Sequence, residues 1–443
     1  MGKAVMIQGT ASDVGKSIIV TGLCRIFANQ GLKVFPFKSQ NMALNSYTTV
    51  NGDEMSSAQL VQAEAARRTP DIRMNPILLK PVKDSRTKVI FNGKLLETLD
   101  AKAYYQEKRK LKKEIKKIYD EVVKENDLII IEGAGSPAEI NLNKDDFVNM
   151  GMAEIANSPV ILVADIDRGG VFASIYGTIK LLSERDQKRV KGIIINKFRG
   201  DISLLDEGLT MIENLVDVPV IGVVPYIPLK IDSEDSLALD QASVEFDSTK
   251  DIDIAILKLS MMNNFTEFNS LTMFEDVSVR FVDSVNQLRK PDVLIIPNTE
   301  DVMRNQRALE VNGWLEKIKK LNMESTIIMT FGEGKKLVKD FNLLNVIELD
   351  PTEVQKEAFK ENLVEDTHLK VDNKLISIEF EGLFEHLNWT RNFLNKILLT
   401  KGKPILLPPS VSYSEFKNNQ YDILANHLRK HIDLEKLDKI INS

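Results

Sequence analysis

The sequence predicts an α/β protein in which a parallel β-sheet bearing a phosphate loop precedes a second α/β domain. Short, almost wholly apolar segments alternate with amphipathic stretches, which is typical of parallel strands that are buried on both faces and covered by helices. The segment GTASDVGKS at 9–17 directly follows the first of these strands and matches the pattern of a phosphate-binding loop. The length of 443 residues allows roughly two to three domains.

Six apolar segments of the first half are predicted to form the strands of one sheet. They are residues 4–8, 33–36, 128–132, 160–164, 192–195 and 220–223. Helices are expected between them, including residues 15–29, 54–68 and 111–125. The Lys-rich segment 108–124 spaces its apolar residues three and four apart, so we interpret it as a helix with a solvated basic face rather than a polyanion site.

A second alternating series follows an acidic, Ser-containing stretch. Its predicted strands are residues 252–257, 277–281, 293–297, 326–330 and 375–380, and residues 413–441 are expected to form one or two closing helices. We therefore predict a first domain at 1–232, a linker at 233–250 and a second domain at 251–443.

The composition is that of an ordinary soluble globular protein, with 43% hydrophobic and 28% charged residues. The net charge of -6 argues against a nucleic-acid partner, which would favour a basic surplus. No segment has the length of a membrane span or the pattern of a signal peptide, so we expect a cytoplasmic protein without a membrane partner.

Cysteine and histidine are scarce. Cys24 is the single cysteine, which excludes a disulfide within the chain and a Cys-rich metal cluster. The four histidines are His368, His386, His427 and His431. The chemistry of the first 367 residues must therefore rest on carboxylates, lysines, amides, hydroxyls and a bound metal.

The phosphate loop predicts a nucleoside triphosphate site with Mg²⁺. A loop between a strand and a helix directs backbone N–H groups and the helix dipole at phosphate. Lys16 is expected to reach the terminal phosphates and Ser17 to ligate Mg²⁺. The residues predicted to bind the nucleotide are Gly9, Thr10, Asp13, Gly15, Lys16, Ser17 and, through a base edge, Asn196.

Glu132 ends a buried strand and is followed by Gly133. In a parallel sheet this carboxylate lies beside the phosphate loop, where a metal ion is held, so we predict Glu132 as the second metal ligand. Thr10 and Ala11 do not supply the additional lysine of partition ATPases, and no GTPase switch signature is present.

Several blocks resemble the cobyric acid synthase (CobQ) family. They are MIQGTASDVGKS and FPFKSQNMALNSY within 6–47, QLVQAEAA at 59–66, MNPILLKP at 74–81, IEGAGSPAEINL at 131–142, VNMGMAE at 148–154, VADIDRGGVFAS at 163–174 and INKFRGD at 195–201. The first domain is also similar to dethiobiotin synthetase. The resemblance implies a dethiobiotin synthetase-like P-loop domain followed by a glutamine amidotransferase-like domain.

The family resemblance implies an ATP-dependent amidation in cobalamin biosynthesis. ATP would phosphorylate peripheral carboxylates of a corrinoid, adenosylcobyrinic acid a,c-diamide, and ammonia would displace the phosphate. Lys16, Lys38 and Glu132 are then the predicted catalytic residues, with Mg²⁺ on Ser17 and Glu132. The residues expected to contact the substrate are Gln40, Asn41, Asn45, Lys80, Asp167 and Arg168.

The second domain resembles the family's glutamine amidotransferase domain, but its nucleophile is replaced. NNFTEF at 263–268 and FEGLF at 380–384 are similar to family segments, whereas Phe331 stands at the cysteine position and Glu381 at the histidine position. Cys24 lies in the other domain, so we expect this glutaminase to be inactive. A Thr330 nucleophile served by His386 is conceivable, but no triad spacing supports it.

Three interpretations stay open at this point. The first is a corrinoid amide ligase that takes ammonia either free or from a separate glutaminase. The second is an amide ligase for another polycarboxylate. The third is a nucleotide-dependent binding or scaffold protein without catalysis.

Overall fold

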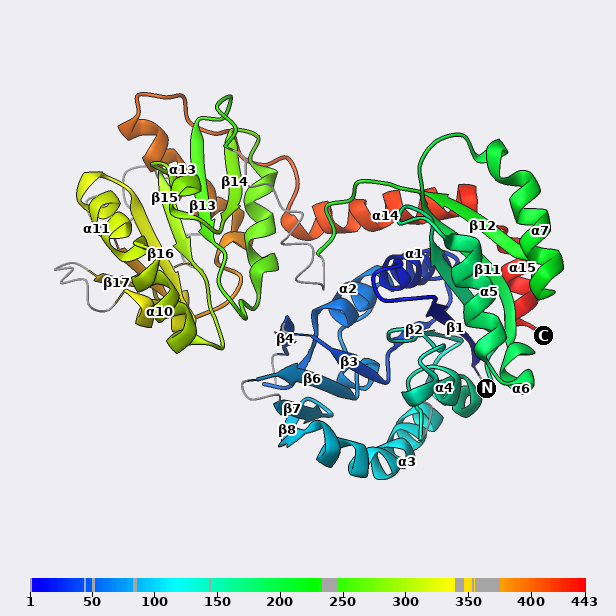
Figure 1. Ribbon diagram of the computed structural model, residues 1–443. Helices are drawn as coiled ribbons and strands as arrows, with labels where there is room; N and C mark the ends of the chain where they lie inside the picture. Colours follow the sequence, from blue (N-terminus) through cyan, green and yellow to red (C-terminus); the bar gives the residue numbers. More distant parts are fainter. Residues whose placement is uncertain are drawn as a thin grey trace. The chain divides into compact units, whose positions relative to one another are not determined.

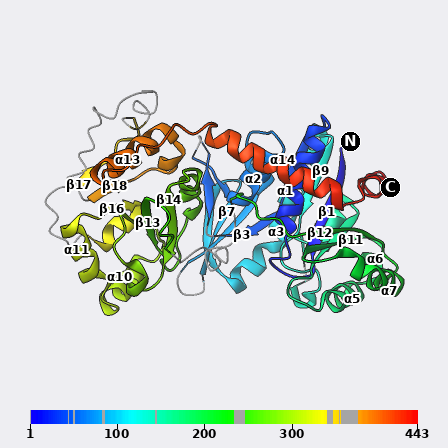
Figure 2. The same ribbon diagram turned by 90° about the horizontal axis from the view of Figure 1, so that it is seen from above.

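The structure, a computed structural model, describes residues 2–43, 45–49, 52–82, 86–142, 145–232, 246–338, 346–352, 354 and 375–443. The chain divides into two compact units. The first comprises Met1–Ile231 together with Lys417–Ser443, and the second comprises Asp232–Phe416 (Figures 1 and 2).

The first unit is built on a six-stranded parallel sheet in the order β12-β11-β10-β1-β9-β2. Its strands are β1 (Lys3–Gly9), β2 (Val34–Phe37), β9 (Leu128–Glu132), β10 (Val160–Asp165), β11 (Val190–Phe198) and β12 (Val220–Pro225). These correspond to the six predicted strands. The register pairs Ile7 with Glu132 and Gly9 with Val163, so the loop after β1 begins where its neighbouring strands end.

Helices cover both faces of this sheet, and each face has its own hydrophobic core (Figure 1). The helices that follow in the chain are α1 (Lys16–Asn29), α2 (Ser57–Ala65), α3 (Ala101–Glu125), α4 (Met150–Ala156), α5 (Val171–Leu181), α6 (Glu184–Gln187) and α7 (Asp206–Val216). Short 3₁₀ turns lie at η1 (Ile72–Met74), η2 (Ile140–Leu142) and η3 (Ile202–Leu205). In the described part of the chain, every helix is too short or too polar to span a bilayer.

A four-stranded sheet in the order β3-β6-β7-β8 was not foreseen from the sequence. Its strands are β3 (Gln40–Met42), β6 (Ile77–Pro81), β7 (Arg86–Phe91) and β8 (Lys94–Asp100), and a two-stranded ribbon is formed by β4 (Ser46–Thr48) and β5 (Glu54–Ser56). The turn between β7 and β8 contains Asn92 and Gly93, both with positive φ, which is a hairpin signal present in the sequence. The helix predicted at 54–68 begins later, because residues 54–56 belong to the ribbon and Ser56 caps α2.

The predicted domain boundary is corrected at the C-terminus. We assigned residues 251–443 to one domain, whereas α14 (Tyr413–His431) packs against α1, and Lys417–Ser443, including α15 (Leu434–Ile441), belong to the first unit (Figures 1 and 2). A Cβ atom on Gly22 would lie 2.3 Å from Leu428 Cδ1, so α14 approaches the α1 backbone closely.

An ion pair fixes this contact between α1 and α14. Arg25 is 1% exposed and donates from Nε to Asp422 Oδ1 at 2.8 Å and from Nη2 to Asp422 Oδ2 at 2.9 Å. Asn418 also accepts from the same guanidinium at 3.0 Å. Amphipathicity alone predicted these closing helices, but it does not specify which core a helix covers.

The second unit contains another six-stranded parallel sheet, in the order β14-β13-β15-β16-β18-β17. Its strands are β13 (Ile252–Leu257), β14 (Val277–Val282), β15 (Val293–Ile296), β16 (Ile327–Phe331), β17 (Val346–Glu348) and β18 (Leu375–Ile378). The helices are α9 (Val285–Leu288), α10 (Val302–Val311), α11 (Trp314–Glu324) and α13 (Leu387–Thr400), with 3₁₀ segments η4 (Phe265–Met273), η5 (Gly332–Leu337) and η6 (Leu383–Glu385). The five predicted strands are present and β17 is an addition. Most of the predicted linker, residues 233–245, lies outside the described residues.

Replacing Asp422 by alanine should destabilise the first unit. The substitution leaves the buried Arg25 guanidinium without its carboxylate, and a buried charge without its partner is costly. We expect the free energy of unfolding to fall by about 2 kcal/mol, and not more, because Asp422 itself is partly exposed. Hydrogen exchange of α14 amides measures the loss, with Asp438→Ala on exposed α15 surface as the matched control. Equal protection in both variants would contradict this account.

Candidate functional site

The phosphate loop joins β1 to the N-terminus of α1. Gly15, immediately before α1, has a φ of 96°, and a Cβ atom there would lie 2.1 Å from Asn196 Nδ2, so only glycine fits. Thr10 anchors the start of the loop, because its N–H donates to Val163 O at 2.9 Å. Asp13 near its middle has a φ of 58°. The loop therefore has the conformation expected at the end of a buried strand.

Lys16 crosses the loop. It is 7% exposed, and its Nζ donates to Ala11 O at 2.8 Å and to Gly135 O at 3.1 Å. The first bond spans the loop and the second reaches the turn after β9. A Cβ atom on Gly9 would lie 2.9 Å from this ammonium, so the glycine leaves space for it. The cation is thus held between the two segments that a phosphate chain would contact.

Glu132 is the electrostatic centre of the site. It is 1% exposed, and it accepts from Ser17 Oγ at 2.8 Å, from Lys38 Nζ at 2.9 Å and from Gln62 Nε2. Burial by itself raises the pKa of Glu132, but the Lys38 ammonium and the three hydrogen bonds outweigh it and lower the pKa below its usual value. The carboxylate is therefore ionised at neutral pH.

Ser17 and Glu132 fit a magnesium ion. Their oxygens are 2.8 Å apart at the end of the sheet beside the loop, and hydroxyl and carboxylate oxygens are ligands that Mg²⁺ accepts. No group of three or more His, Cys, Asp or Glu side chains able to hold a metal occurs among the described residues. This pair suits an ion that keeps waters and substrate phosphates as its other ligands.

Asn196 supports the loop. Its Nδ2 donates to Val14 O at 2.9 Å and the residue is 6% exposed, so its amide nitrogen contacts the phosphate loop, and its contact with a base edge stays a prediction. The neighbouring Lys197 donates to Asp13 O at 2.5 Å and to Asp165 Oδ2 at 2.9 Å. Sequence reasoning missed Lys197 and Asp165, although both lie at strand ends facing the loop.

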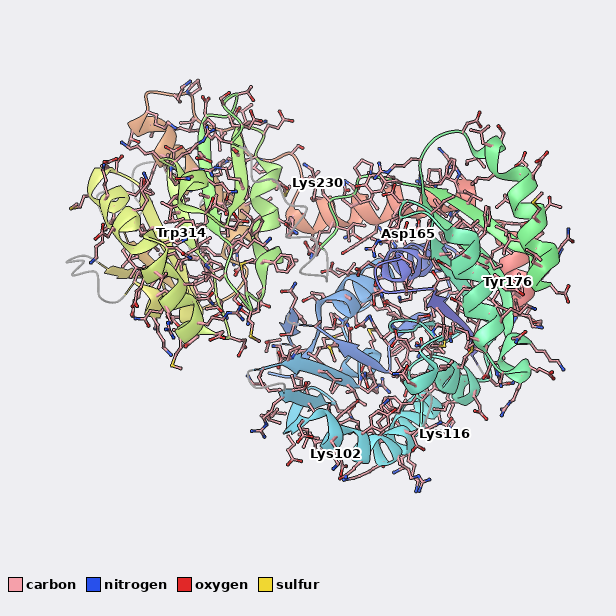
Figure 3. All side chains as sticks on the ribbon, viewed as in Figure 1. Lys102, Lys116, Asp165, Tyr176, Lys230 and Trp314 are labelled. Atoms are coloured by element: carbon pink, nitrogen blue, oxygen red, sulfur yellow. The ribbon has the colours of Figure 1, made fainter. Side chains whose placement is uncertain are left out.

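Asp167 and Arg168 lie at the same edge as the phosphate loop. Arg168 is largely exposed and is 3.5 Å from the Asp13 carboxylate, while Asp167 accepts from Arg199 Nε at 3.0 Å. Figure 3 labels Asp165 at this edge. These residues are thus brought next to the nucleotide side of the site.

The predicted substrate residues of the small sheet form their own polar network. Gln40 accepts from Tyr104 Oη, and Asn41 Nδ2 donates to Ser56 Oγ at 2.7 Å and to Gln59 Oε1 at 3.2 Å. In a second part of this network, Lys80 donates to Ser46 Oγ at 2.9 Å and to Glu54, and Asn45 is 1% exposed. Helix α2 connects this network to Glu132, because it carries both Gln59, which accepts from Asn41, and Gln62, which donates to Glu132.

Four amides of the site were not singled out from the sequence. Gln8, Gln59, Gln62 and Asn149 each have one buried polar atom without a hydrogen-bond partner. All but Gln8 lie in the blocks QLVQAEAA and VNMGMAE. Their residue types gave no signal, because a sequence does not distinguish a buried amide that lacks a hydrogen-bond partner from one that has all of its partners.

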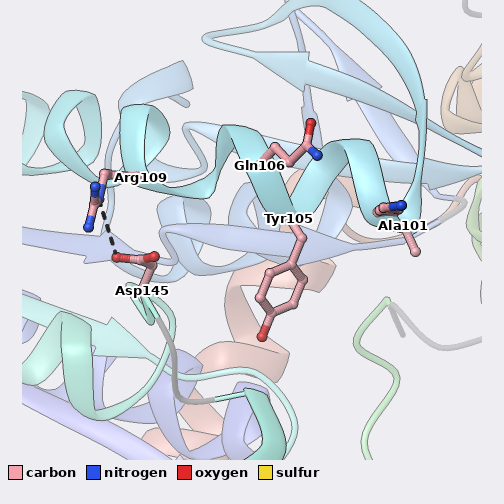
Figure 4. Close-up of a pocket in the computed structure, with 6 residues that line it drawn as sticks. Ala101, Tyr105, Gln106, Arg109 and Asp145 are labelled. Atoms are coloured by element: carbon pink, nitrogen blue, oxygen red, sulfur yellow. Dashed lines mark ion pairs between the residues drawn. The ribbon is translucent and has the colours of Figure 1, made fainter.

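A cavity of about 700 Å³ lies beside the first turns of α3, and this is the size of a small-molecule site. It is lined by Ala101, Lys102, Tyr105, Gln106, Arg109 and Asp145. Figure 4 shows the Tyr105 ring and Asp145 on one side of α3 and Gln106 pointing to the other, with Arg109 and Asp145 paired at 3.9 Å. The basic face of α3 therefore includes a hollow lined by two cations, one of them paired with the Asp145 carboxylate, and by an aromatic ring.

The strand end of β16 in the second unit is filled by an aromatic cluster. Phe331 has extended backbone (φ −114°, ψ 129°) and is 2% exposed. Its ring lies 5.3 Å from that of Phe268 and 5.9 Å from that of Phe384. A nucleophile on a strand-to-helix elbow would instead have a strained backbone and an exposed side chain. The side chain at this position is thus part of the core.

Carboxylates surround the predicted histidine position. Glu381 accepts from Asn264 Nδ2, and Glu267 Oε2 accepts from the Gly382 N–H at 3.3 Å. Burial, together with the nearby Glu381 and Glu385 carboxylates, raises the pKa of Glu267 to about 8. At neutral pH this carboxyl group is therefore mostly protonated.

Nothing in the described structure forms a replacement nucleophile and base. The Thr330 hydroxyl is buried without a hydrogen-bond partner, so His386 does not contact it. Cys24 is fully buried in the core of the first unit, and burial raises the pKa of its thiol. His427 bonds Pro225 O at 2.9 Å and lies beside His431, whereas His368 is outside the described residues.

Comparisons with known proteins match both parts of the chain. The family of CobQ/CobB/MinD/ParA nucleotide binding domains matches residues 5–237, and the family of CobB/CobQ-like glutamine amidotransferase domains matches residues 253–331. The "Cobyric acid synthase" of Streptococcus sanguinis is 46% identical, with 100% of this chain and 99% of that protein covered. The proteins of the same name from Clostridium novyi and Limosilactobacillus reuteri are 42% and 43% identical. Each of these two comparisons covers 99% of this chain and 98% of the relative.

The alignment with the Streptococcus protein extends over 497 positions, whereas this chain has 443 residues. The relative therefore has segments without a counterpart here.

The stability of the second unit should fall as pH rises from about 4.5 to about 8. Over this range folded Glu267 keeps a proton that the unfolded chain has lost, so folding binds a proton and is weakened by raising the pH. Glu267→Gln should remove this part of the pH dependence.

Tryptophan fluorescence during urea unfolding measures this effect, because both tryptophans, Trp314 and Trp389, belong to the second unit. Figure 3 labels Trp314. The control is Glu275→Gln, which changes an exposed carboxylate that is not among Glu267, Glu381 and Glu385. The same pH slope in wild type and Glu267→Gln would show that Glu267 titrates normally.

Proposed function

Because the chain belongs to the cobyric acid synthase family over its full length, we propose that it amidates peripheral carboxylates of adenosylcobyrinic acid a,c-diamide in cobalamin biosynthesis. It is an ATP-dependent, amide-forming ligase. The observation that carries the proposal is the intact centre of Lys16, Ser17, Lys38 and Glu132. The predicted compartment remains the cytoplasm.

The residues of the centre serve phosphoryl transfer. Transfer of a terminal phosphoryl group to a carboxylate brings several negative charges together, and stabilising them is the main task of the protein. Lys16, at the loop, and Lys38, beside Glu132, supply fixed positive charge in a buried setting. Mg²⁺, held by Ser17 and Glu132, would neutralise phosphate oxygens. No histidine is required, which agrees with the absence of histidine before residue 368.

The small sheet and the α3 cavity support binding of a large polycarboxylate. Lys102 and Arg109 give the cavity a cationic lining, and Tyr105 adds an aromatic face. Gln59 keeps a buried, unpartnered Nε2 donor one turn from Gln62, which bonds Glu132. A donor at this place suits the carbonyl oxygen of the carboxylate that is activated.

The ammonia comes from outside this chain. The nucleophile position holds the buried Phe331, and the single cysteine belongs to the other unit. The amidotransferase family match covers residues 253–331, and relatives carry segments that this chain lacks. These observations support a second unit that keeps the glutaminase fold without its chemistry, so that free ammonia or a separate glutaminase is the source.

Isotope-labelled nitrogen tests the proposal. The purified chain is supplied with ATP, Mg²⁺ and adenosylcobyrinic acid a,c-diamide, and with either ¹⁵N-ammonium or amide-labelled glutamine. We expect ¹⁵N in the product from ammonium, and a rate from glutamine that is lower by about a hundredfold or more. Lys16→Ala should lower the ammonium-dependent rate by about a hundredfold.

Each part of the proposal has its own contradicting result. No amidation with ammonium would overturn the ligase assignment and favour a nucleotide-dependent scaffold. Efficient use of glutamine by this chain alone would show an active glutaminase. Faster amidation of an unrelated polycarboxylate would overturn the corrinoid assignment.

A further inference from the structure

Three buried amide oxygens without a hydrogen-bond partner surround the turn after β9. They are Gln8 Oε1, Gln62 Oε1 and Asn149 Oδ1. Gln8 and Gln62 are 0% exposed, and the Asn149 oxygen is buried as well. A buried acceptor without a donor is destabilising, so such atoms are rare unless a ligand or water satisfies them.

The three amides converge on Glu132 and Gly133. Gln62 Nε2 donates to the Glu132 carboxylate, and Asn149 Nδ2 donates to Ala134 O at 2.7 Å. These bonds fix the two amides so that oxygen is the unpartnered atom. A Cβ atom on Gly133 would lie 2.3 Å from Asn149 Oδ1 and 3.2 Å from Gln8 Cγ. The absence of a Cβ at Gly133 therefore lets the Asn149 and Gln8 side chains pack directly against the backbone of this turn.

The chemistry of the ligand follows from the lining. All three unpartnered atoms are acceptors, so they suit a small molecule that donates several hydrogen bonds and they disfavour an anion. The Gln8 amide nitrogen faces only sulfur atoms, Met6 Sδ at 3.3 Å and Met150 Sδ at 3.7 Å. The Glu132 carboxylate, which accepts from Gln62 Nε2, is a further acceptor group beside them. Ammonia, with three N–H bonds and one lone pair, matches such a set.

We propose that Gln8, Gln62 and Asn149, which we call the amide cradle, bind the ammonia that attacks the activated carboxylate. The inference rests on the function proposed above. With its N–H bonds directed at the cradle, the nitrogen presents its lone pair to the acyl phosphate. A C–N bond forms, the C–O bond to phosphate breaks, and phosphate leaves with the electron pair and accepts one proton from nitrogen.

The proposal also explains why the cradle lies in the first unit. Ammonia from any source must meet the acyl phosphate beside Glu132, where the two cationic side chains lie. A binding site at that place works without a glutaminase in the same chain.

Gln8→Met tests the cradle, because methionine keeps the length of the side chain and removes the carbonyl oxygen. We expect the KM for ammonium to rise by about tenfold, the effect of one lost hydrogen bond to a small ligand. Asn149→Ala, which removes a second cradle oxygen, should raise it similarly. The control is Asn322→Leu on α11 of the second unit, which removes another buried amide with an unpartnered oxygen and is expected to keep the wild-type KM.

Positional isotope exchange in ATP separates the steps. The exchange moves ¹⁸O between the β,γ-bridging position of ATP and the non-bridging positions of its β-phosphate. With corrinoid present and ammonia absent, it reports acyl phosphate formation alone. In Gln8→Met and Asn149→Ala, the rate of this exchange should fall by a smaller factor than the factor by which the KM for ammonium rises. No exchange in the wild type would mean that the proposed ligase function fails. Exchange in the wild type and a variant, with an unchanged KM for ammonium in that variant, would overturn the cradle.

Discussion

The site depends on the charge compensation of one buried carboxylate. Glu132 is held in its ionised form by Lys38 and by hydrogen bonds from Ser17 and Gln62. Glu132 lies at the end of β9, and its three partners come from three other places in the chain: the residue after β2, the first turn of α1 and the middle of α2. A buried carboxylate without them would be protonated or would prevent folding. The parallel register of β1, β9 and β2 and the docking of α2 therefore serve the same centre.

At the end of β16 in the second unit, where the family resemblance predicts a cysteine, the side chain is a buried phenylalanine. A parallel sheet delivers the end of β16 to the same edge whether the residue there is a cysteine or a phenylalanine. Phe331 joins Phe268 and Phe384 in the core, and burial of a side chain of this size stabilises a fold by about 2 kcal/mol. The Phe331 ring thus stabilises the core and occupies space that an open site would leave to substrate.

The sequence was informative where one local signal dominates. The strands of both parallel sheets are mainly apolar, and the phosphate loop has a fixed spacing around Lys16, so both were predictable. The small sheet was missed because its strands mix polar with apolar residues and β7 and β8 are partly exposed, with Gln40 and Lys80 among the residues of β3 and β6. The docking of α14 was missed because amphipathicity does not identify the partner surface. The amide cradle was missed because Gln8 and Asn149 become distinctive only when their unpartnered oxygens are seen.

The most direct test of the central claim is the effect of Mg²⁺ on ATP affinity, measured by calorimetry for the wild type and for Glu132→Gln. If ionised Glu132 and Ser17 hold the ion beside the phosphate loop, Mg²⁺ tightens ATP binding to the wild type by about tenfold or more. Glu132→Gln, which keeps the shape of the side chain and removes its charge, should lose most of this enhancement. An enhancement of equal size in both proteins would contradict the role assigned to Glu132.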